Sequence, residues 1–156
     1  DLSYGDEMLV DGVRFYSENL NNPWGFANGS IDCLVSMMLF EHLFDPWFCF
    51  SEVKRVLSPD GRAFVNLPIV TNAKNRLRLA FGRLPETSVP YARWRSEGHW
   101  DGFHLHYFSC DSIEDLASAS GLKIVSRSGV GRMTWLKNIF PSLLCGELSF
   151  ELAHAP

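Results

Sequence analysis

Two short groups of polar side chains in this sequence are of types that carry out acid–base chemistry. Glu41 and His42 are adjacent, and a carboxylate beside an imidazole can exchange protons near neutral pH. His104 and His106 alternate, so on an extended segment both side chains would point to one face. There they could bind a substrate, or one could act as a base for an oxygen acceptor. A hydrogen-bonded histidine that orders its own loop is the alternative, and these patterns assign no catalytic residue.

Metal binding is a third chemistry that the same stretch raises. Cys110 follows His106 closely, which gives three donor side chains when His104 is included. A tetrahedral zinc site needs a fourth ligand, and none is evident, so we predict no metal site. The four cysteines are far apart and form no CxxC pair, which excludes a zinc ribbon and a redox motif. Free thiols in a reducing, cytoplasmic setting are expected.

Basic and aromatic side chains of the middle region could also meet a ligand. Trp94 and Trp100 lie near Arg93 and Arg95 and could stack on a sugar or a ring, although an apolar plug beneath a loop is the simpler interpretation. A phosphate or carboxylate could bind four basic side chains, which a solvated helix face explains equally well. These are Lys74, Arg76, Arg78 and Arg83.

The elements that must position these groups follow from length and hydrophobic pattern. With 156 residues, 46% of them hydrophobic, residues 1–156 are expected to form one domain. Ile31–Ser36 is predicted to be a strand buried on both faces, and Asp45 begins a predicted helix that runs to Leu57. Residues 59–61 would turn the chain into a second buried strand, Ala63–Leu67. Strand, helix and strand in this order predict parallel pairing in an α/β fold.

The second half of the chain alternates between irregular and regular patterns. Residues 69–107 show no clean period and are expected to form a lid or substrate insertion within the domain. Residues 111–114 (DSIE) match a capping box that opens a helix, and Gly121 should end that helix. Leu122–Ser126 is a third strand candidate, and Leu148–Ala153 alternates as a final antiparallel strand does.

Charge and apolar runs argue against two classes of partner. The formal net charge is −4, which disfavours nucleic-acid binding through a basic face. The most apolar stretch, residues 33–50, is interrupted by Glu41, His42 and Asp45. A membrane helix needs about 20 nearly continuous apolar residues, so no membrane span is predicted. With nucleic acid and membrane disfavoured, a small molecule is the expected partner.

One run of residues carries a family resemblance. It comprises residues 29–36 (GSIDCLVS), 40–43 (FEHL), 45–46 (DP) and 52–61 (EVKRVLSPDG), followed later by 104–109 (HLHYFS). In order, spacing and residue type this run resembles the class I S-adenosylmethionine-dependent methyltransferases, in particular those of type 11. The resemblance implies a Rossmann-like α/β sheet with helices on both faces. It also implies transfer of a methyl group from S-adenosylmethionine to an acceptor that the sequence does not identify.

The resemblance assigns roles to particular residues. Apart from the resemblance, the alternation of His104 and His106 makes them the candidates for binding the acceptor. Glu41 and His42 occur in the family whatever the substrate, which favours a structural or site-shaping role, and Arg55 is expected to anchor structure. A polar turn is an equally good interpretation of residues 18–20. The implied contacts of the cofactor are Asp1, Glu18, Asn19, Leu20 and Met37.

The resemblance begins after the part of the family that holds most of the cofactor. That part is the first strand with its glycine-rich turn, and no such segment precedes Asp1. We therefore expect an N-terminally truncated, partial methyltransferase domain with weak cofactor binding or none. In the family's strand order, 3-2-1-4-5-7-6, the first strand pairs with the strand predicted here at 31–36. An open sheet edge is expected, which self-association to a dimer would cover. A non-catalytic, methyltransferase-like interaction module is the alternative function.

Overall fold

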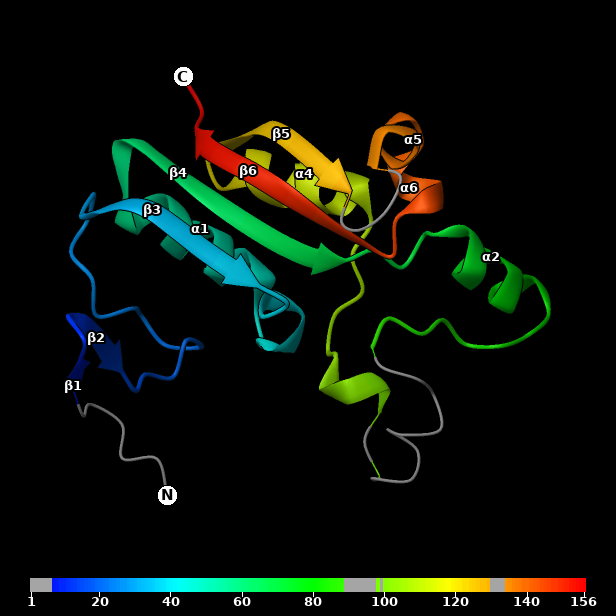
Figure 1. Ribbon diagram of the computed structural model, residues 1–156, viewed down its shortest axis with the longest axis horizontal. Coiled ribbons are helices and arrows are strands. Elements are labelled where there is room, and N and C mark those ends of the chain that lie inside the picture. Colours follow the sequence, from blue (N-terminus) through cyan, green and yellow to red (C-terminus); the bar gives the residue numbers. More distant parts are fainter. Residues whose placement is uncertain (1–6, 89–97, 99, 130–133) are drawn as a thin grey trace.

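A four-stranded sheet forms the centre of the chain in a computed structural model, which describes residues 7–88, 98, 100–129 and 134–156. The first two strands run parallel, and the third runs antiparallel to both of its neighbours (Figure 1). This order matches strands 4-5-7-6 of the family sheet, so the predicted α/β fold is confirmed. The strands, in order across the sheet, are β3 (Ile31–Met37), β4 (Leu57–Pro68), β6 (Glu147–His154) and β5 (Leu122–Gly129).

Two helices lie against one face of this sheet and bury its apolar side chains (Figure 1). α1 (Pro46–Val56) lies behind β3 and β4, and α4 (Cys110–Ala119) lies behind β5 and β6. α1 begins as predicted, because the Asp45 carboxylate accepts hydrogen bonds from the N–H groups of Trp47 and Phe48, at 2.9 and 3.2 Å. The core between sheet and helices includes Phe50, Val53, Ile113, Leu148 and Phe150.

β4 starts directly after α1, where the sequence predicts a turn. Residues 59–61 lie inside the strand, and a bulge accommodates them, because Ile31 pairs with Leu57 whereas Cys33 pairs with Arg62. Gly61 serves a close approach of two backbones and not a turn. A Cβ at this position would lie 3.0 Å from the carbonyl oxygen of Ile31. The predicted turn is therefore wrong, and the predicted strand 63–67 is confirmed.

α4 uses a different N-terminal cap from the one predicted. The Ser109 hydroxyl accepts from the N–H of Ser112 at 3.1 Å, and the Ser112 hydroxyl accepts from the N–H of Ser109 at 2.9 Å. The capping box predicted over residues 111–114 is wrong, because those residues already lie in the first turn. The predicted end is confirmed, since Gly121 follows the helix with a φ of 74°.

β3 is the outer strand of the described sheet, and the exposure of its side chains contradicts the prediction of a strand buried on both faces. Val35 and Met37 are 64% and 60% exposed, and Ser36 alone among the seven residues of β3 is buried. Among the described residues, β3 pairs with β4 on one side only. An apolar run of this kind suits an interior strand, but burial depends on neighbours that the pattern itself does not reveal.

Shorter elements complete the described chain. β1 (Glu7–Val10) and β2 (Val13–Tyr16) form an antiparallel hairpin separate from the main sheet. Within the described ranges, no helix has the length and apolar character that crossing a membrane requires. The remaining elements are η1 (Phe40–His42), α2 (Ala73–Ala80), η2 (Asp101–Phe103), α5 (Thr134–Ile139) and α6 (Pro141–Leu144).

A buried ion pair attaches the loop before β3 to α1. Arg55 donates to both carboxylate oxygens of Glu52 at 2.7 Å, and to the carbonyl oxygens of Trp24 and Phe26 at 2.9 and 2.7 Å. Glu52 also accepts from the N–H of Trp24 at 2.7 Å. The hydrogen bonds from Arg55 hold the pKa of the Glu52 carboxyl below its ordinary value. Arg55 is therefore an anchor of structure, as predicted.

Candidate functional site

The carboxyl ends of β3 and β4 meet the start of β6 at one edge of the sheet. In open α/β sheets, ligands bind outside the carboxyl ends of the parallel strands. Met38 extends the pairing beyond β3, because its N–H donates to the carbonyl oxygen of Asn66 at 3.0 Å. Its φ of 50° is uncommon for a residue with a Cβ and redirects the chain into η1. η1 then carries Glu41 and His42.

Glu41 is fully buried in this region without a hydrogen-bonding partner for its side chain. Neither carboxylate oxygen accepts a hydrogen bond from any residue that the structure describes. Burial raises the pKa of the Glu41 carboxyl, and part of this rise is offset by the carboxyl's own backbone N–H and by the charge that His42 carries when protonated. The Glu41 backbone is engaged, since its carbonyl oxygen accepts from the N–H groups of Leu105 and His106 at 2.8 and 3.2 Å. These bonds join η1 to the segment that follows η2.

Two imidazoles face the Glu41 carboxylate. The rings of His42 and His104 pack edge to face, with centroids 4.8 Å apart. The Nε2 atom of each ring lies 3.9 Å from Oε1 of Glu41, which is too long for a hydrogen bond. His104 is buried, and burial lowers its pKa, as does the nearby His42. The structure thus gathers one carboxylate and two imidazoles from two separate segments.

Asp101 is a second buried carboxylate, and it is fully hydrogen-bonded. It accepts from the N–H and hydroxyl groups of Thr87 and Ser88, at 2.6 to 3.3 Å, and from the Tyr107 hydroxyl at 3.0 Å. Burial alone would raise the pKa of Asp101, but the hydrogen bonds from Ser88 and Thr87 outweigh it and lower the pKa. Burial and the charge of Asp101 raise the pKa of Tyr107 to about 12. Asp101 is therefore ionised at neutral pH.

The Thr87 hydroxyl links Asp101 to His104. It donates to Oδ2 of Asp101 at 2.9 Å and lies 2.7 Å from Nδ1 of His104. Because a hydroxyl has a single proton and this one is given to the carboxylate, Nδ1 of His104 must be the donor in the second bond. The ring is thereby fixed in the tautomer whose Nε2 carries a free lone pair, and that lone pair faces Glu41.

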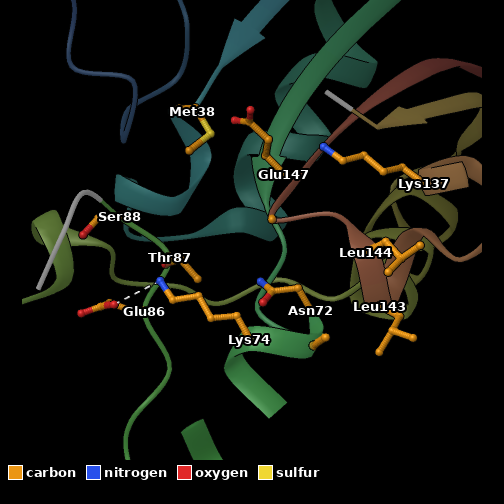
Figure 2. A pocket seen from close by; sticks show the side chains of 12 residues that line it. Met38, Asn72, Lys74, Glu86, Thr87, Ser88, Lys137, Leu143, Leu144 and Glu147 are labelled. Atoms are coloured by element: carbon orange, nitrogen blue, oxygen red, sulfur yellow. Dashed lines mark hydrogen bonds and ion pairs between the residues drawn. The ribbon is translucent and has the colours of Figure 1, made fainter. Parts of the chain in front are cut away.

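A cavity of about 530 Å³ adjoins this relay at the same edge of the sheet. Thr87 belongs to both the cavity wall and the relay. Figure 2 shows the Lys74 ammonium reaching the Glu86 carboxylate, at 3.3 Å, with Met38, Glu147 and Lys137 on the opposite side of the view. The cavity therefore offers positive charge, negative charge and hydroxyl groups to a bound molecule.

Asn75 holds the segment that carries Thr87 in place. Its side chain is fully buried, and it donates to the carbonyl oxygen of Glu86 and accepts from the N–H of Glu86, both at 3.0 Å. Oε2 of Glu86 also lies 3.4 Å from Nη1 of Arg78. α2 thus holds Glu86 in the wall of the cavity through the Asn75 amide and through two cations, Arg78 and Lys74.

His104 and His106, the predicted acceptor-binding pair, have different surroundings. His104 joins Glu41 and His42, whereas Nε2 of His106 donates to the carbonyl oxygen of Phe44 at 3.2 Å. Cys110 is buried in α4 and is not part of the Glu41 cluster. Acceptor binding by the two histidines stays a prediction.

Three of the predicted cofactor contacts, Glu18, Asn19 and Leu20, lie in a loop whose polar side chains bond within the loop. Oε2 of Glu18 accepts from the N–H of Gly25 at 3.2 Å, and Oδ1 of Asn19 accepts from the N–H of Asn21 at 3.1 Å. Leu20 packs against the core. These bonds are those of the polar turn that the sequence offered as an alternative.

Of the other two predicted cofactor contacts, the structure describes one. Met37 is exposed at the end of β3, and Asp1 lies outside the described residues. Cofactor binding by these residues stays a prediction.

Of the basic and aromatic candidates, Lys74, Arg76 and Arg78 have partners within the chain. Arg76 donates to the carbonyl oxygen of Thr71 at 2.6 Å, while Arg83 and Trp100 are exposed. Lys74 and Arg78 pair with Glu86 as described. Arg93, Trp94 and Arg95 lie outside the described residues.

Sequence reasoning missed Thr87, Asp101 and Tyr107. All three lie in the region without a clean period, and their residue types are common on any surface. The backbone at Asp101 adopts a φ of 35°, and Phe103 a φ of 67°, conformations that no sequence signal indicated. Only the folded chain shows that these residues surround His104.

Comparison with known proteins identifies the family to which this architecture is related. A family model described as a methyltransferase domain matches residues 3–65, which include β3, η1 and α1. No curated protein sequence matches the chain. The family match covers the same residues 29–61 that carry the resemblance in the sequence.

Solved structures of methyltransferases share the fold at low sequence identity. One is a chain from a Haloferax volcanii complex between the Trm112 methyltransferase activator and a predicted methyltransferase, with a TM-score of 0.62 and 13% identity over 96% of this chain. Another is an S-adenosylmethionine-dependent methyltransferase from Mesorhizobium loti, with a TM-score of 0.58 and 12% identity over 86%. A third is the Burkholderia thailandensis 1,6-didemethyltoxoflavin-N1-methyltransferase with bound S-adenosylhomocysteine, with a TM-score of 0.56 and 15% identity over 94%.

These matches confirm the resemblance to the class I S-adenosylmethionine-dependent methyltransferases and show that the chain has their fold. The chain spans less than two thirds of the length of each of the three, namely 65%, 66% and 52%.

Proposed function

We propose that the chain takes part in S-adenosylmethionine-dependent transfer of a methyl group to a small polar acceptor. The observation that carries this proposal is the cavity of about 530 Å³ at the carboxyl ends of β3 and β4, in a fold shared with methyltransferases. Its volume is in the range of about 300–1,000 Å³ that is usual for small-molecule sites. The family match at residues 3–65 supports the same class of chemistry.

The residues of the cavity favour an acceptor with polar or charged groups. Lys74 and Glu86 stand on one side, and Lys137 and Glu147 on the other, so that donors and acceptors of hydrogen bonds alternate around the wall. Thr87 brings the buried His104 into indirect contact with the cavity. We assign to residues 69–107 the role of a substrate insertion, because Lys74, Glu86 and Thr87 all come from it.

Cofactor contacts by Asp1, Glu18, Asn19, Leu20 and Met37 remain part of this proposal. A part of each related structure has no counterpart in the chain, and we expect further cofactor contacts from the equivalent region. For the 156 residues by themselves, weak affinity for the cofactor follows. The affinity for the cofactor would then depend on Met37, at the carboxyl end of β3.

Calorimetric titration of S-adenosylhomocysteine into the chain tests this proposal. We expect a dissociation constant in the millimolar range, a small upward shift of the melting temperature, and loss of both in Met37→Asp. Val35→Asp is the matched control, because Val35 is equally exposed on the same strand but further from its carboxyl end. No heat and no thermal shift at millimolar ligand would contradict the proposal.

A second candidate function, an interaction module, is favoured by the exposed outer edge of β3. Exposed apolar edge strands readily pair with another chain, and Val35 lies at the centre of this one. The occupant that we propose is a second copy of the chain, paired through β3. Light scattering should give the mass of a dimer, with slow amide exchange along residues 31–36. A monomer with rapid exchange along those residues would exclude it.

A further inference from the structure

We infer that Glu41, His42 and His104 form a binding site for one divalent transition-metal ion. These residues offer one carboxylate and two imidazoles, and their ligand atoms all lie within 4.8 Å of one another. Two histidines and one carboxylate are a ligand set that zinc, iron and related first-row ions accept. The site differs from the His104, His106 and Cys110 arrangement for which the sequence predicted no metal.

The hydrogen bonds behind both histidines leave the correct nitrogen free. Nδ1 of His104 donates to the Thr87 hydroxyl at 2.7 Å, and Nδ1 of His42 lies 3.2 Å from the carbonyl oxygen of Phe103. A carbonyl oxygen only accepts, so Nδ1 of His42 carries the proton as well. In the neutral form of each ring the proton therefore lies on Nδ1 and Nε2 keeps its lone pair for an ion, and both Nε2 atoms lie 3.9 Å from Oε1 of Glu41.

The carboxylate in the centre of the cluster lacks any other partner. Glu41 is fully buried, and neither of its oxygens accepts a hydrogen bond from the described residues. A buried carboxylate without hydrogen bonds is costly, whereas a bound cation would satisfy it directly. The lack of hydrogen bonds to this carboxylate is an observation separate from the orientation of the histidines, and it also points to a bound cation.

Bonds of about 2.1 Å to a tetrahedral metal place the ligand atoms about 3.4 Å apart. The two separations of 3.9 Å to Oε1 of Glu41 exceed this by about 0.5 Å, and no pair of ligand atoms is more than 4.8 Å apart, so side-chain rotations of this size would close the site. The side chain of His42 is 36% exposed, which gives an ion access from solvent. Three protein ligands leave a coordination position for water or for an oxygen atom of a bound molecule.

The surroundings are those that hold metal-binding histidines in known proteins. A histidine that binds a metal through one ring nitrogen donates the N–H of its other ring nitrogen to a carboxylate or a backbone carbonyl. This bond fixes the ring and makes it a better ligand. His42 uses the carbonyl of Phe103, and His104 reaches the Asp101 carboxylate through Thr87. Phe103 and Asp101 both have positive φ, so the backbone is held in an uncommon conformation where it supports the rings.

Cobalt absorption and zinc calorimetry on the 156-residue chain test the site. All samples carry Cys33→Ser, because Cys33 is an exposed thiol that would bind these ions itself. We expect one equivalent of Co²⁺ to give visible absorption bands, which one equivalent of Zn²⁺ removes. His42→Ala and Glu41→Gln should weaken Zn²⁺ binding at least about 100-fold, and Thr87→Val about 10-fold.

The matched control is His154→Ala. His154 also bonds a backbone carbonyl through a ring nitrogen, that of Leu57 at 2.9 Å, but lies outside the cluster, so its loss should leave Zn²⁺ affinity unchanged. His42 is partly exposed, so its variant should stay folded, which circular dichroism verifies. No cobalt bands at millimolar Co²⁺, or bands that persist in His42→Ala and Glu41→Gln, would overturn the inference. The readout is ion binding alone, so its failure is distinct from failure of the proposed methyl transfer.

Discussion

Two buried glutamates in this molecule have opposite surroundings. Glu52, on α1, accepts from Arg55 and from the N–H of Trp24, and these bonds lower its pKa. Glu41, on η1, is buried still more completely and accepts no side-chain hydrogen bond from the described residues, and its pKa is raised. Burial raises the pKa of both carboxyl groups, but only for Glu52 do hydrogen bonds outweigh this effect.

The difference separates a structural group from a candidate site. The Glu52 network connects the loop at Trp24 to the helix and has no capacity left for a ligand. The Glu41 cluster is held in shape from behind, by the hydrogen bonds of His42 and His104, while its centre remains unsatisfied. Uncompensated polar groups that the fold nevertheless holds in place are a common property of functional sites.

The largest effect expected from this comparison is the loss of the Glu52 network. Glu52→Ala removes three hydrogen bonds and leaves Arg55 without its anion, so the free energy of unfolding should fall by about 2–3 kcal/mol. Urea denaturation measures it. Glu114→Ala is the control, because Glu114 pairs with Arg127 at 3.0 Å on the surface and should contribute about 0.5 kcal/mol or less. Equal effects of the two substitutions would contradict a structural role for Glu52.

An intermediate effect is expected at the hydroxyl that holds His104. Thr87→Val keeps the shape of the side chain but leaves the buried Nδ1–H of His104 unpaired and takes one donor from Asp101. The free energy of unfolding should fall by about 1–2 kcal/mol. Thr71→Val is matched, since the Thr71 hydroxyl bonds only to that of Ser142, at 2.9 Å, and a smaller loss is expected from it. A loss no larger than that of Thr71→Val would show that the relay does not order the site.

The smallest effect has the opposite sign. Glu41→Gln removes a buried charge that accepts no hydrogen bond from the described residues, so it should raise the free energy of unfolding at pH 7 by about 1 kcal/mol in metal-free solution. If Glu41 were a structural group like Glu52, the same substitution would destabilise the chain. Thermal unfolding in the presence of a chelator, with Glu52→Gln in parallel, distinguishes the two.

The pH dependence of stability should have opposite signs for Glu41 and Glu52, because folding shifts their pKa values in opposite directions. The ordinary pKa of a glutamate is 4.5, and that of Glu41 is raised in the folded chain. Between these two pKa values the folded chain holds a proton on Glu41 that the unfolded chain has lost. The stability gained in Glu41→Gln should therefore grow as pH rises above 4.5 and vanish below it. For Glu52 the folded pKa is lowered, so its stabilisation is present above 4.5 and is lost as pH falls through the folded pKa. Unfolding curves between pH 3 and pH 7 measure both trends.

Local rules were sufficient for several elements of the fold. Asp45 and Pro46 begin α1, and Gly121 follows α4 with positive φ, because caps and glycine act through their immediate backbone. The parallel pairing of β3 with β4 also followed from the order of elements. The same rules misplaced the cap of α4 and the turn before Gly61, where an adjacent serine and a bulge with β3 determine the backbone.

The candidate site could be predicted only by residue type. Glu41, His42 and His104 were recognised as chemically capable, but His104 was grouped with His106, its neighbour in sequence. The folded backbone turns at Asp101 and Phe103 and places His104 against His42 instead. Thr87 and Asp101 carried no signal, since their importance depends entirely on which groups they contact.

The sequence by itself determined the class of fold, the start of α1 and the family resemblance of residues 29–61, because these depend on short-range patterns of hydrophobicity, caps and motif spacing. Only the tertiary structure decided that the Glu41 carboxylate is buried without a hydrogen bond from the described residues, and that Thr87 orients His104. Burial and hydrogen-bond pairing are properties of neighbours in space, and those neighbours come from segments that are distant along the chain.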